Sequence, residues 1–318
     1  MSFASNRNSF SGEYKKKGFF QAEYNEIFLD SIISIIQQHF ASHLAQSAQK
    51  PLRVLSIGAG CGNTEYSFQQ KLLKAGFNPV IDATDISESQ IKVAKETYEN
   101  STLQFKVESA EALQDKNKYD LIICLFAFHW FDDKAKVAGK IKSALTQNGL
   151  FFALIPLEKP QLFSLRQKNV DFWKPYLDNF QLKPLVGDPE IYQGIFMGQF
   201  EFMQSQYQRN VHEFSQTKFQ GFVSGWIPEL RVKKSRTRSG EPMEALAPAQ
   251  KKSLLNDLTT SIPEHKEDND IGIDNQDIIN FGERIWVVAC SNQSFDFTLT
   301  APNVDETSET SFNIKRFV

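Results

Sequence analysis

The sequence of 318 residues has few cysteines, little net charge and no long hydrophobic run. Its three cysteines, Cys61, Cys124 and Cys290, lie far apart without a CxxC pair, which argues against a disulfide framework and against structural zinc. The formal net charge of -3 argues against a protein that coats nucleic acid. No apolar run reaches the roughly 18 residues of a membrane span, and the first residues lack the apolar core of a secretory signal. We therefore expect a cytoplasmic protein with no membrane span and no nucleic-acid partner.

Hydrophobic periodicity predicts alternating helices and strands as far as residue 156. Short apolar runs separated by helices indicate βαβ units, and therefore a doubly wound α/β fold with a mostly parallel sheet. The expected strands are Leu52–Ile57, Pro79–Asp85, Leu103–Val107, Tyr119–Leu125 and Leu150–Ile155. The expected helices are Tyr24–Ala45, Asn63–Ala75, one that Ser87 and Gln90 begin as a capping box, and Lys134–Leu145, closed by Gly149.

Beyond residue 158 the strand signals become sparse and aromatic residues become dense. We expect one domain over residues 1–318, in which a helical segment (1–50) precedes the core (51–158). Residues 159–283 would form a mainly helical, aromatic cap with an edge strand, and residues 284–318 a closing strand and tail. Many of the 28 phenylalanines fall in the cap or at the end of the fourth strand, where we expect them to face a cavity. The helix predicted in the cap is Ala249–Thr260, and the basic run Arg231–Arg238 is interpreted as a solvated linker.

A glycine cluster follows the first expected strand, as Gly58-Ala-Gly60-Cys-Gly62. Glycine is needed where a strand turns sharply into a helix and where a ligand approaches the backbone closely. The dinucleotide fingerprint would place its third glycine at Asn63, and no Gly-Lys-Ser/Thr follows as in a phosphate loop. The spacing therefore favours a nucleotide site that is neither an NAD site nor a phosphate loop.

An acidic residue ends the second expected strand. Asp85 lies 25 residues after Gly60, where a carboxylate can accept hydrogen bonds from both hydroxyls of an unphosphorylated ribose. Asp82 is the competing candidate, and the position at the strand end favours Asp85.

The successive segments VLSIGAGCGN, VIDATDIS, VESAEAL, YDLIICLFAFHWFDD and LTQNGLFFALIP resemble the motifs of the class I S-adenosylmethionine-dependent methyltransferases. The resemblance covers Leu52–Pro156, and RIWVVAC at Arg284–Cys290 is similar to the last hairpin strand of the family. It implies a Rossmann-like fold with a seven-stranded sheet, and S-adenosyl-L-methionine as the cofactor, with S-adenosyl-L-homocysteine as the product.

Two finer resemblances suggest different methyl acceptors. FAFHWF and FWKPY resemble the trans-aconitate and juvenile hormone acid methyltransferases, which methylate carboxylates of small molecules. LSIGAGCG is also similar to the turn of histamine N-methyltransferase, which keeps a small amine as the alternative acceptor. The family usually has an acidic residue at the positions of Ser56 and Ser109, so a non-catalytic regulatory protein that binds the cofactor is a further alternative.

The resemblance also implies roles for individual residues. The glycine turn would pack against the methionine part of the cofactor, Asp85 and Ile86 would hold the ribose and adenine, and residues 109–111 would form the adenine wall. The complete predicted cofactor-binding set is Ser56, Gly58, Ala59, Gly60, Asn63, Asp85, Ile86, Ser109, Ala110, Glu111 and Leu125. We interpret Cys61 as a small packing residue of the turn rather than as a nucleophile.

His129 and Trp130 follow the fourth strand, at the sheet edge where open α/β sheets bind ligands. His129 is the predicted catalytic residue, which would orient a carboxylate as a hydrogen-bond donor or deprotonate an amine; a packed core histidine is the alternative. The predicted substrate-binding set is Tyr24, Phe128, His129, Trp130, Trp173, Tyr176 and Trp226. His39 and His43 are spaced i,i+4 without an accompanying carboxylate or thiol, so no metal site is expected.

Overall fold

The computed structural model describes nine stretches of the chain, and these divide into two compact units. The described residues are 19–45, 50–157, 189–224, 231–232, 244–245, 247–260, 271–273, 278–294 and 312–316. The first unit comprises Met1–Pro156, Asp188–Gln208 and Ile285–Val318, and the second comprises Leu157–Gly187 and Arg209–Arg284. The predicted division into core and cap remains a prediction.

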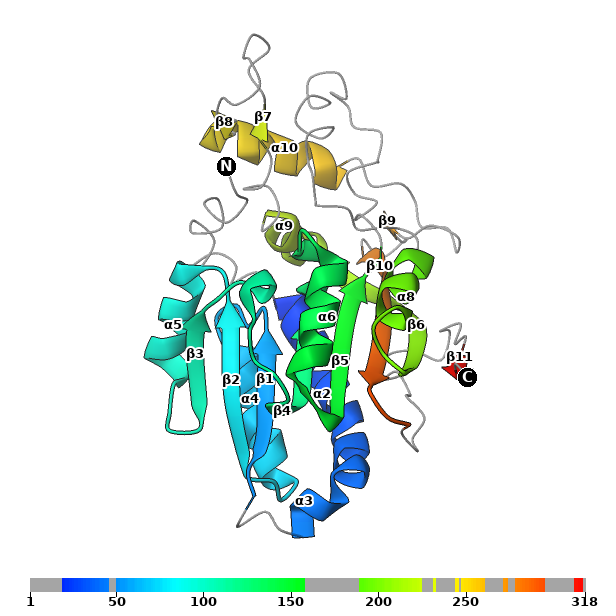
Figure 1. The fold of residues 1–318 in the computed structure, drawn as a ribbon. Coiled ribbons are helices and arrows are strands. Elements are labelled where there is room, and N and C mark those ends of the chain that lie inside the picture. The colour runs from blue at the N-terminus through cyan, green and yellow to red at the C-terminus, as the bar shows by residue number, and fades with distance from the viewer. Residues whose placement is uncertain are drawn as a thin grey trace, which may run out of the picture. The chain divides into compact units, whose positions relative to one another are not determined.

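The chain forms a mixed sheet, most of which belongs to the first unit, whereas residues 271–273 and parts of two longer strands belong to the second (Figure 1). Its strand order is β11-β6-β10-β5-β4-β1-β2-β3, and β9 pairs with β10 beside this path, which makes nine strands among the described residues. The strands are β1 (Leu52–Ile57), β2 (Pro79–Asp85), β3 (Leu103–Val107), β4 (Tyr119–Leu125), β5 (Leu145–Pro156), β6 (Phe202–Ser215), β9 (Ile271–Ile273), β10 (Ile278–Ser291) and β11 (Phe312–Arg316). The predicted seven-stranded sheet is confirmed as the run from β6 to β3, to which β9 and β11 are added.

The strands β1 to β5 are parallel, and the end of β10 pairs antiparallel with β5. β1, β2, β3 and β4 have the predicted bounds. β5 begins five residues earlier than the predicted Leu150. The preceding helix ends at Ala144, one residue before the predicted Leu145, and Gly149 lies within β5 instead of closing the helix. β6 contains the buried polar residues Gln204, Ser205 and Gln206, so hydrophobic periodicity does not predict this strand. β6 is not an edge strand, since β11 pairs with it.

Helices cover both faces of this sheet. Figure 1 shows α6 (Lys134–Ala144) in front of the strands, and α2 (Phe19–His39) and α4 (Asn63–Lys74) behind them. The single predicted first helix is divided at Phe40, after which α3 (Ala41–Ala45) follows. Because helices cover both faces, the parallel strands are buried as apolar runs, and in β4 every residue but the last is buried.

The capping box predicted at Ser87 is wrong. Ser87 is the residue before α5 (Glu88–Tyr98), but its side chain makes no capping hydrogen bond and lies 3.2 Å from Ser89 Oγ. In a capping box Gln90 would accept the backbone N–H of Ser87. That N–H instead donates to Asp85 Oδ1 at 2.8 Å, so Asp85 takes the place of Gln90 as the acceptor.

An aromatic cluster lies in the first unit between the sheet and α8 (Pro189–Met197). Phe128 lies 4.8 Å from Phe196, and Phe196 lies 5.7 Å from both Phe151 and Trp286, measured between ring centroids. All four side chains are fully buried. These aromatic residues therefore fill the core, although the sequence predicts that such residues face a cavity.

The second unit contains α9 (Gln216–Ser224) and α10 (Pro248–Thr260), which pack against each other, and a small sheet of β7 (Arg231–Val232) with β8 (Glu244–Ala245). Phe219, Leu254 and Ile279 are its fully buried apolar residues among those described. α10 confirms the helix predicted at Ala249–Thr260. In the described part of the chain, no helix combines the length and apolarity that crossing a membrane would require.

Candidate functional site

The glycine turn after β1 has a backbone that only glycine adopts easily. Gly58, Gly60 and Gly62 have φ angles of 82°, 56° and 83°, all in the left-handed region. A Cβ atom on Gly58 would lie 2.2 Å from the Cβ of Ala127, in the loop after β4. The chain therefore passes from β1 to α4 in tight contact with the end of β4, and Asn63 begins that helix.

Asp85 ties this turn to the end of β2. Its Oδ2 accepts the backbone N–H of Gly60 at 3.0 Å, and its Oδ1 accepts that of Ser87 at 2.8 Å. A carboxylate offers about four acceptor positions, so two remain for further donors such as the hydroxyls of a ribose. The predicted juxtaposition of Asp85 and the glycine turn is thus present in the structure.

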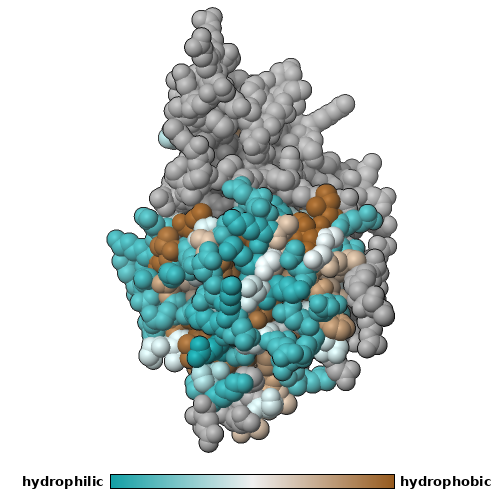
Figure 2. Space-filling model, in the orientation of Figure 1, coloured by the Kyte–Doolittle hydropathy of each residue, from teal (hydrophilic) through white to brown (hydrophobic). Residues whose placement is uncertain are grey.

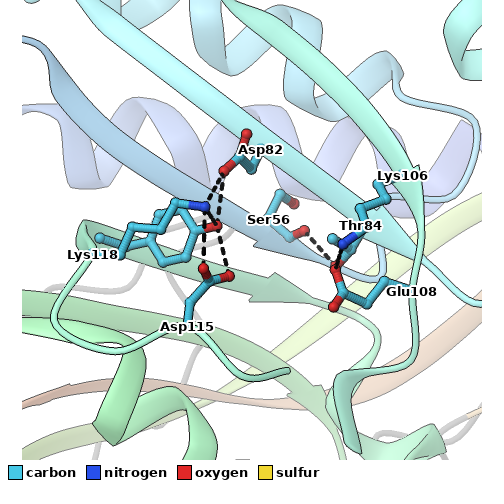
Figure 3. A network of polar contacts seen from close by, with 8 residues as sticks. Ser56, Asp82, Thr84, Lys106, Glu108, Asp115 and Lys118 are labelled. Carbon is cyan, nitrogen blue, oxygen red and sulfur yellow. Dashed lines mark hydrogen bonds and ion pairs between the residues drawn. The ribbon is translucent and has the colours of Figure 1, made fainter. Parts of the chain in front are cut away.

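The competing residue, Asp82, is occupied elsewhere. Its Oδ2 accepts from Lys118 Nζ at 3.0 Å and from the Tyr119 hydroxyl at 2.8 Å, and Asp115 also contacts Lys118 (Figure 3). The nearby carboxylates raise the pKa of Lys118, although its partial burial opposes this. Asp82 belongs to a separate ionic network, so the structure favours Asp85 as the ribose-binding residue.

Two exposed apolar side chains lie beside Asp85. Ile86 is 38 % exposed and Val107 is 44 % exposed, and Val107 is the register partner of Asp85. The part of the described surface visible in Figure 2 is mostly hydrophilic, with separate hydrophobic patches. Adjacent apolar side chains at the carboxyl end of a parallel sheet provide a surface on which a flat base can pack.

The predicted adenine wall is a short 3-10 helix, η2 (Ala110–Ala112). Ser109 Oγ donates to Glu111 Oε2 at 2.5 Å, and Glu111 Oε1 accepts the N–H of Asp132 at 3.1 Å. Glu111 thus holds the wall to the chain that follows β4. Ser109 and Ala110 remain predicted cofactor contacts.

A carboxylate that sequence reasoning missed lies next to the turn. Glu65, in the first turn of α4, accepts a hydrogen bond from Ser56 Oγ at 2.8 Å, and both side chains are buried. Burial raises the pKa of Glu65 to about 7, although the Ser56 hydrogen bond opposes the shift. The signal in the sequence was an acidic residue three positions after Gly62, which could equally belong to an exposed helix face.

The chain turns abruptly after Leu125, the last residue of β4. Phe126 has φ of 53°, which is unusual for a residue other than glycine, and its N–H donates to Leu154 O at 3.0 Å. Its ring packs edge-on against the buried Tyr24 of α2, with centroids 6.0 Å apart. Tyr24 and Leu125 are therefore brought to the sheet edge that carries the glycine turn.

His129 lies in the 3-10 helix η3 (Phe128–Trp130), directly after this turn. It is 4 % exposed, and its ring lies 4.9 Å from that of the half-buried Trp130. Phe128 instead points into the aromatic cluster of the core. The structure thus separates Phe128 from the two residues that remain the predicted contacts of the substrate.

Trp173, Tyr176 and Trp226 lie outside the described residues. Cys61 is buried in the glycine turn, as a packing residue would be. His39 Nε2 lies 2.8 Å from the carbonyl oxygen of Asn148, which is 109 residues away in the sequence. The described residues contain no cluster of three or more His, Cys, Asp or Glu that could hold a metal ion.

The strand order, the left-handed glycine turn and the carboxylate at the end of β2 are the features expected from the resemblance to the class I S-adenosylmethionine-dependent methyltransferases. Residues 55–151 match the family model described as a methyltransferase domain. The resemblance in the sequence is therefore confirmed, and S-adenosyl-L-methionine is the cofactor of this class. The glycine turn leaves no side chain between backbone and ligand, and Asp85 keeps free acceptor positions, so these residues fit that cofactor.

Curated relatives share this domain. The chain is 35 % identical over 118 residues to malonyl-[acyl-carrier protein] O-methyltransferase 1 of Ilyobacter polytropus, covering 36 % of this chain and 42 % of that protein. It is 32 % identical over 165 residues to the second such enzyme of that organism, covering 49 % and 62 %. The match spans about half the length of these relatives. A solved structure from Bacillus halodurans, provisionally assigned as a methyltransferase, has the same fold, with a TM-score of 0.50, 14 % identity and coverage of 80 % and 98 %.

Proposed function

We propose that this protein transfers the methyl group of S-adenosyl-L-methionine to a carboxylate oxygen of a small, partly apolar acceptor. The observation that carries the proposal is the hydrogen bond from the Gly60 N–H to Asp85. It brings the glycine turn and the carboxylate predicted to bind the ribose into one site. The choice of a carboxylate is supported by the relatives, whose names describe O-methylation of a malonyl group on an acyl-carrier protein.

A carboxylate suits the residues near the end of β4. It is already ionised at neutral pH, so it needs no general base. The bound cofactor supplies a methyl group on a positively charged sulfur. His129 would donate a hydrogen bond to the acceptor carboxylate and align one oxygen with that methyl group. Trp130, whose ring packs beside His129, would exclude water, and its face would tolerate a nearby positive charge.

The proposal is tested by incubating the protein with methyl-labelled S-adenosylmethionine and three acceptors, a malonyl thioester of acyl-carrier protein, a free dicarboxylic acid and histamine. We expect a methyl ester from one of the carboxylates, detected by mass spectrometry. A methylated amine alone would establish the alternative of a small-amine N-methyltransferase. Cofactor binding without any product would favour a regulatory protein.

The role of His129 is tested separately in the His129→Ala variant. If this residue orients the acceptor, kcat should fall by about 100-fold or more, while the dissociation constant of S-adenosylhomocysteine changes little. Equal losses of turnover and of cofactor affinity would show that His129 is a packed core residue.

A further inference from the structure

Glu65 has one carboxylate oxygen that nothing in the described structure satisfies. The residue is 4 % exposed, and its Oε1 accepts a hydrogen bond from Ser56. Its Oε2 is buried without a hydrogen-bond partner among the described residues. No described lysine, arginine or histidine forms an ion pair with Glu65. A buried carboxylate with an unpaired oxygen is costly for folding, and a bound cation or hydrogen-bond donor would offset that cost.

The position of Glu65 points to the methionine end of the cofactor. Ser56 comes two residues before Gly58, and Glu65 comes three residues after Gly62, so the bonded pair encloses the glycine turn on both sides. Asp85, which holds Gly60, also acts electrostatically on Glu65. The two carboxylates therefore flank one turn. Asp85 is the one next to the exposed Ile86, which is predicted to contact the adenine.

The methionine end carries an α-ammonium group, which binds best beside a negative charge. The glycines offer no charge, and Ser56 is neutral at the position where the family usually has an acid. Resting on the proposed function, we propose that Glu65 supplies the negative counter-charge for the α-ammonium group of the cofactor. The acid is thereby delivered from the first turn of α4 and is held in place by Ser56.

The electrostatic surroundings of Glu65 fit a group that ionises when a cation arrives. Burial raises its pKa to about 7, and the charge of Asp85 adds to this. Several charged groups on the neighbouring helices and strands are already paired: Glu26 and Asp30 of α2 with Lys71, Lys92 of α5 with Glu96, and Lys106 of β3 with Glu108. Bound ammonium would stabilise the ionised carboxylate, so binding should be coupled to loss of its proton.

The test is isothermal titration of three ligands into the full chain and its Glu65→Gln variant at pH 7.5. S-adenosylhomocysteine and S-adenosylmethionine carry the α-ammonium group, whereas 5′-methylthioadenosine lacks the whole amino-acid end. We expect Glu65→Gln to weaken the first two by about 10- to 100-fold and to leave 5′-methylthioadenosine unchanged. The matched control is Glu26→Gln, which removes an exposed and paired carboxylate and should change none of the affinities.

A pH series gives a readout that a packing role would not change. Between pH 8 and pH 6 the affinity of the unmodified protein for S-adenosylhomocysteine should fall by about tenfold as Glu65 takes up a proton. The Glu65→Gln variant should show no such fall.

Each other outcome overturns a different claim. Unchanged affinity in Glu65→Gln, an equal loss for 5′-methylthioadenosine, or a loss for S-adenosylmethionine alone would overturn the role assigned to Glu65. Failure of the unmodified protein to bind S-adenosylmethionine or S-adenosylhomocysteine would overturn the proposed function, and this inference with it.

Discussion

Asp85 and Asp82 lie on the same strand, three residues apart, and have different partners. Asp85 holds two backbone N–H groups of the turns around the site, whereas Asp82 holds Lys118 and Tyr119. The Asp85→Asn variant should therefore lower the affinity for S-adenosylhomocysteine by about 10-fold or more, measured by titration calorimetry. Asp82→Asn is the control, because it should lower stability without changing that affinity. A reversed pattern would transfer the ribose role to Asp82.

The protonation of Glu65 also links folding to pH. Its pKa is about 7 in the folded protein against the ordinary value of 4.5 expected in the unfolded chain, so the folded state binds the proton more tightly. This contribution to stability is complete below pH 4.5 and is lost as the pH rises through 7. The difference corresponds to about 3 kcal/mol. Between pH 4.5 and pH 8 the free energy of unfolding of Glu65→Gln should therefore rise by up to about that amount relative to the unmodified protein. Urea unfolding at both pH values measures it, and parallel profiles would contradict the prediction.

At the scale of elements, the strand-turn-helix unit of β1, the glycine turn and α4 depends on a backbone without side chains. Gly58→Ala would place a Cβ 2.2 Å from Ala127 in a left-handed conformation, so we expect loss of cofactor binding and a lower melting temperature. Gly194 of α8 has open space around it and sits inside a helix. Gly194→Ala should raise stability by up to about 1 kcal/mol. Thermal unfolding distinguishes the two, and equal effects would show that the turn can relax.

The elements differ in how far the sequence predicts them. β1 to β4 are predicted to the residue, because each is a compact apolar run ended by a turn or by polar residues. The capping box at Ser87 failed because Asp85 competes for the same N–H group, a contact that local pattern rules do not weigh. Buried polar residues concealed β6, which joins the sheet beside the distant strand β10 and pairs on its other side with β11.

At the scale of the whole molecule, a segment far from the core in sequence completes that core. Phe196 of α8 contacts Phe128, Phe151 and Trp286, although α8 lies within the residues predicted to form a cap. Phe196→Ala should lower the free energy of unfolding by about 3–5 kcal/mol. Ile191 lies on the same helix and is 50 % exposed, so Ile191→Ala should cost less than about 1 kcal/mol. Denaturant unfolding measures both, and similar small effects would mean that α8 is dispensable to the core.

The sequence by itself determined the class of fold and the glycine turn, and it placed Asp85 at the end of the neighbouring strand, because these follow from neighbouring residues on single strands and turns. Only the tertiary structure decided which distant side chains meet. It joined Ser56 and Glu65 by a hydrogen bond beside the turn and paired Asp82 with Lys118. It also directed the ring of Phe128 into the core and not toward the predicted substrate site of its neighbour His129. Burial and pairing set these outcomes, and both depend on elements that come together only when the sheet and its helices have assembled.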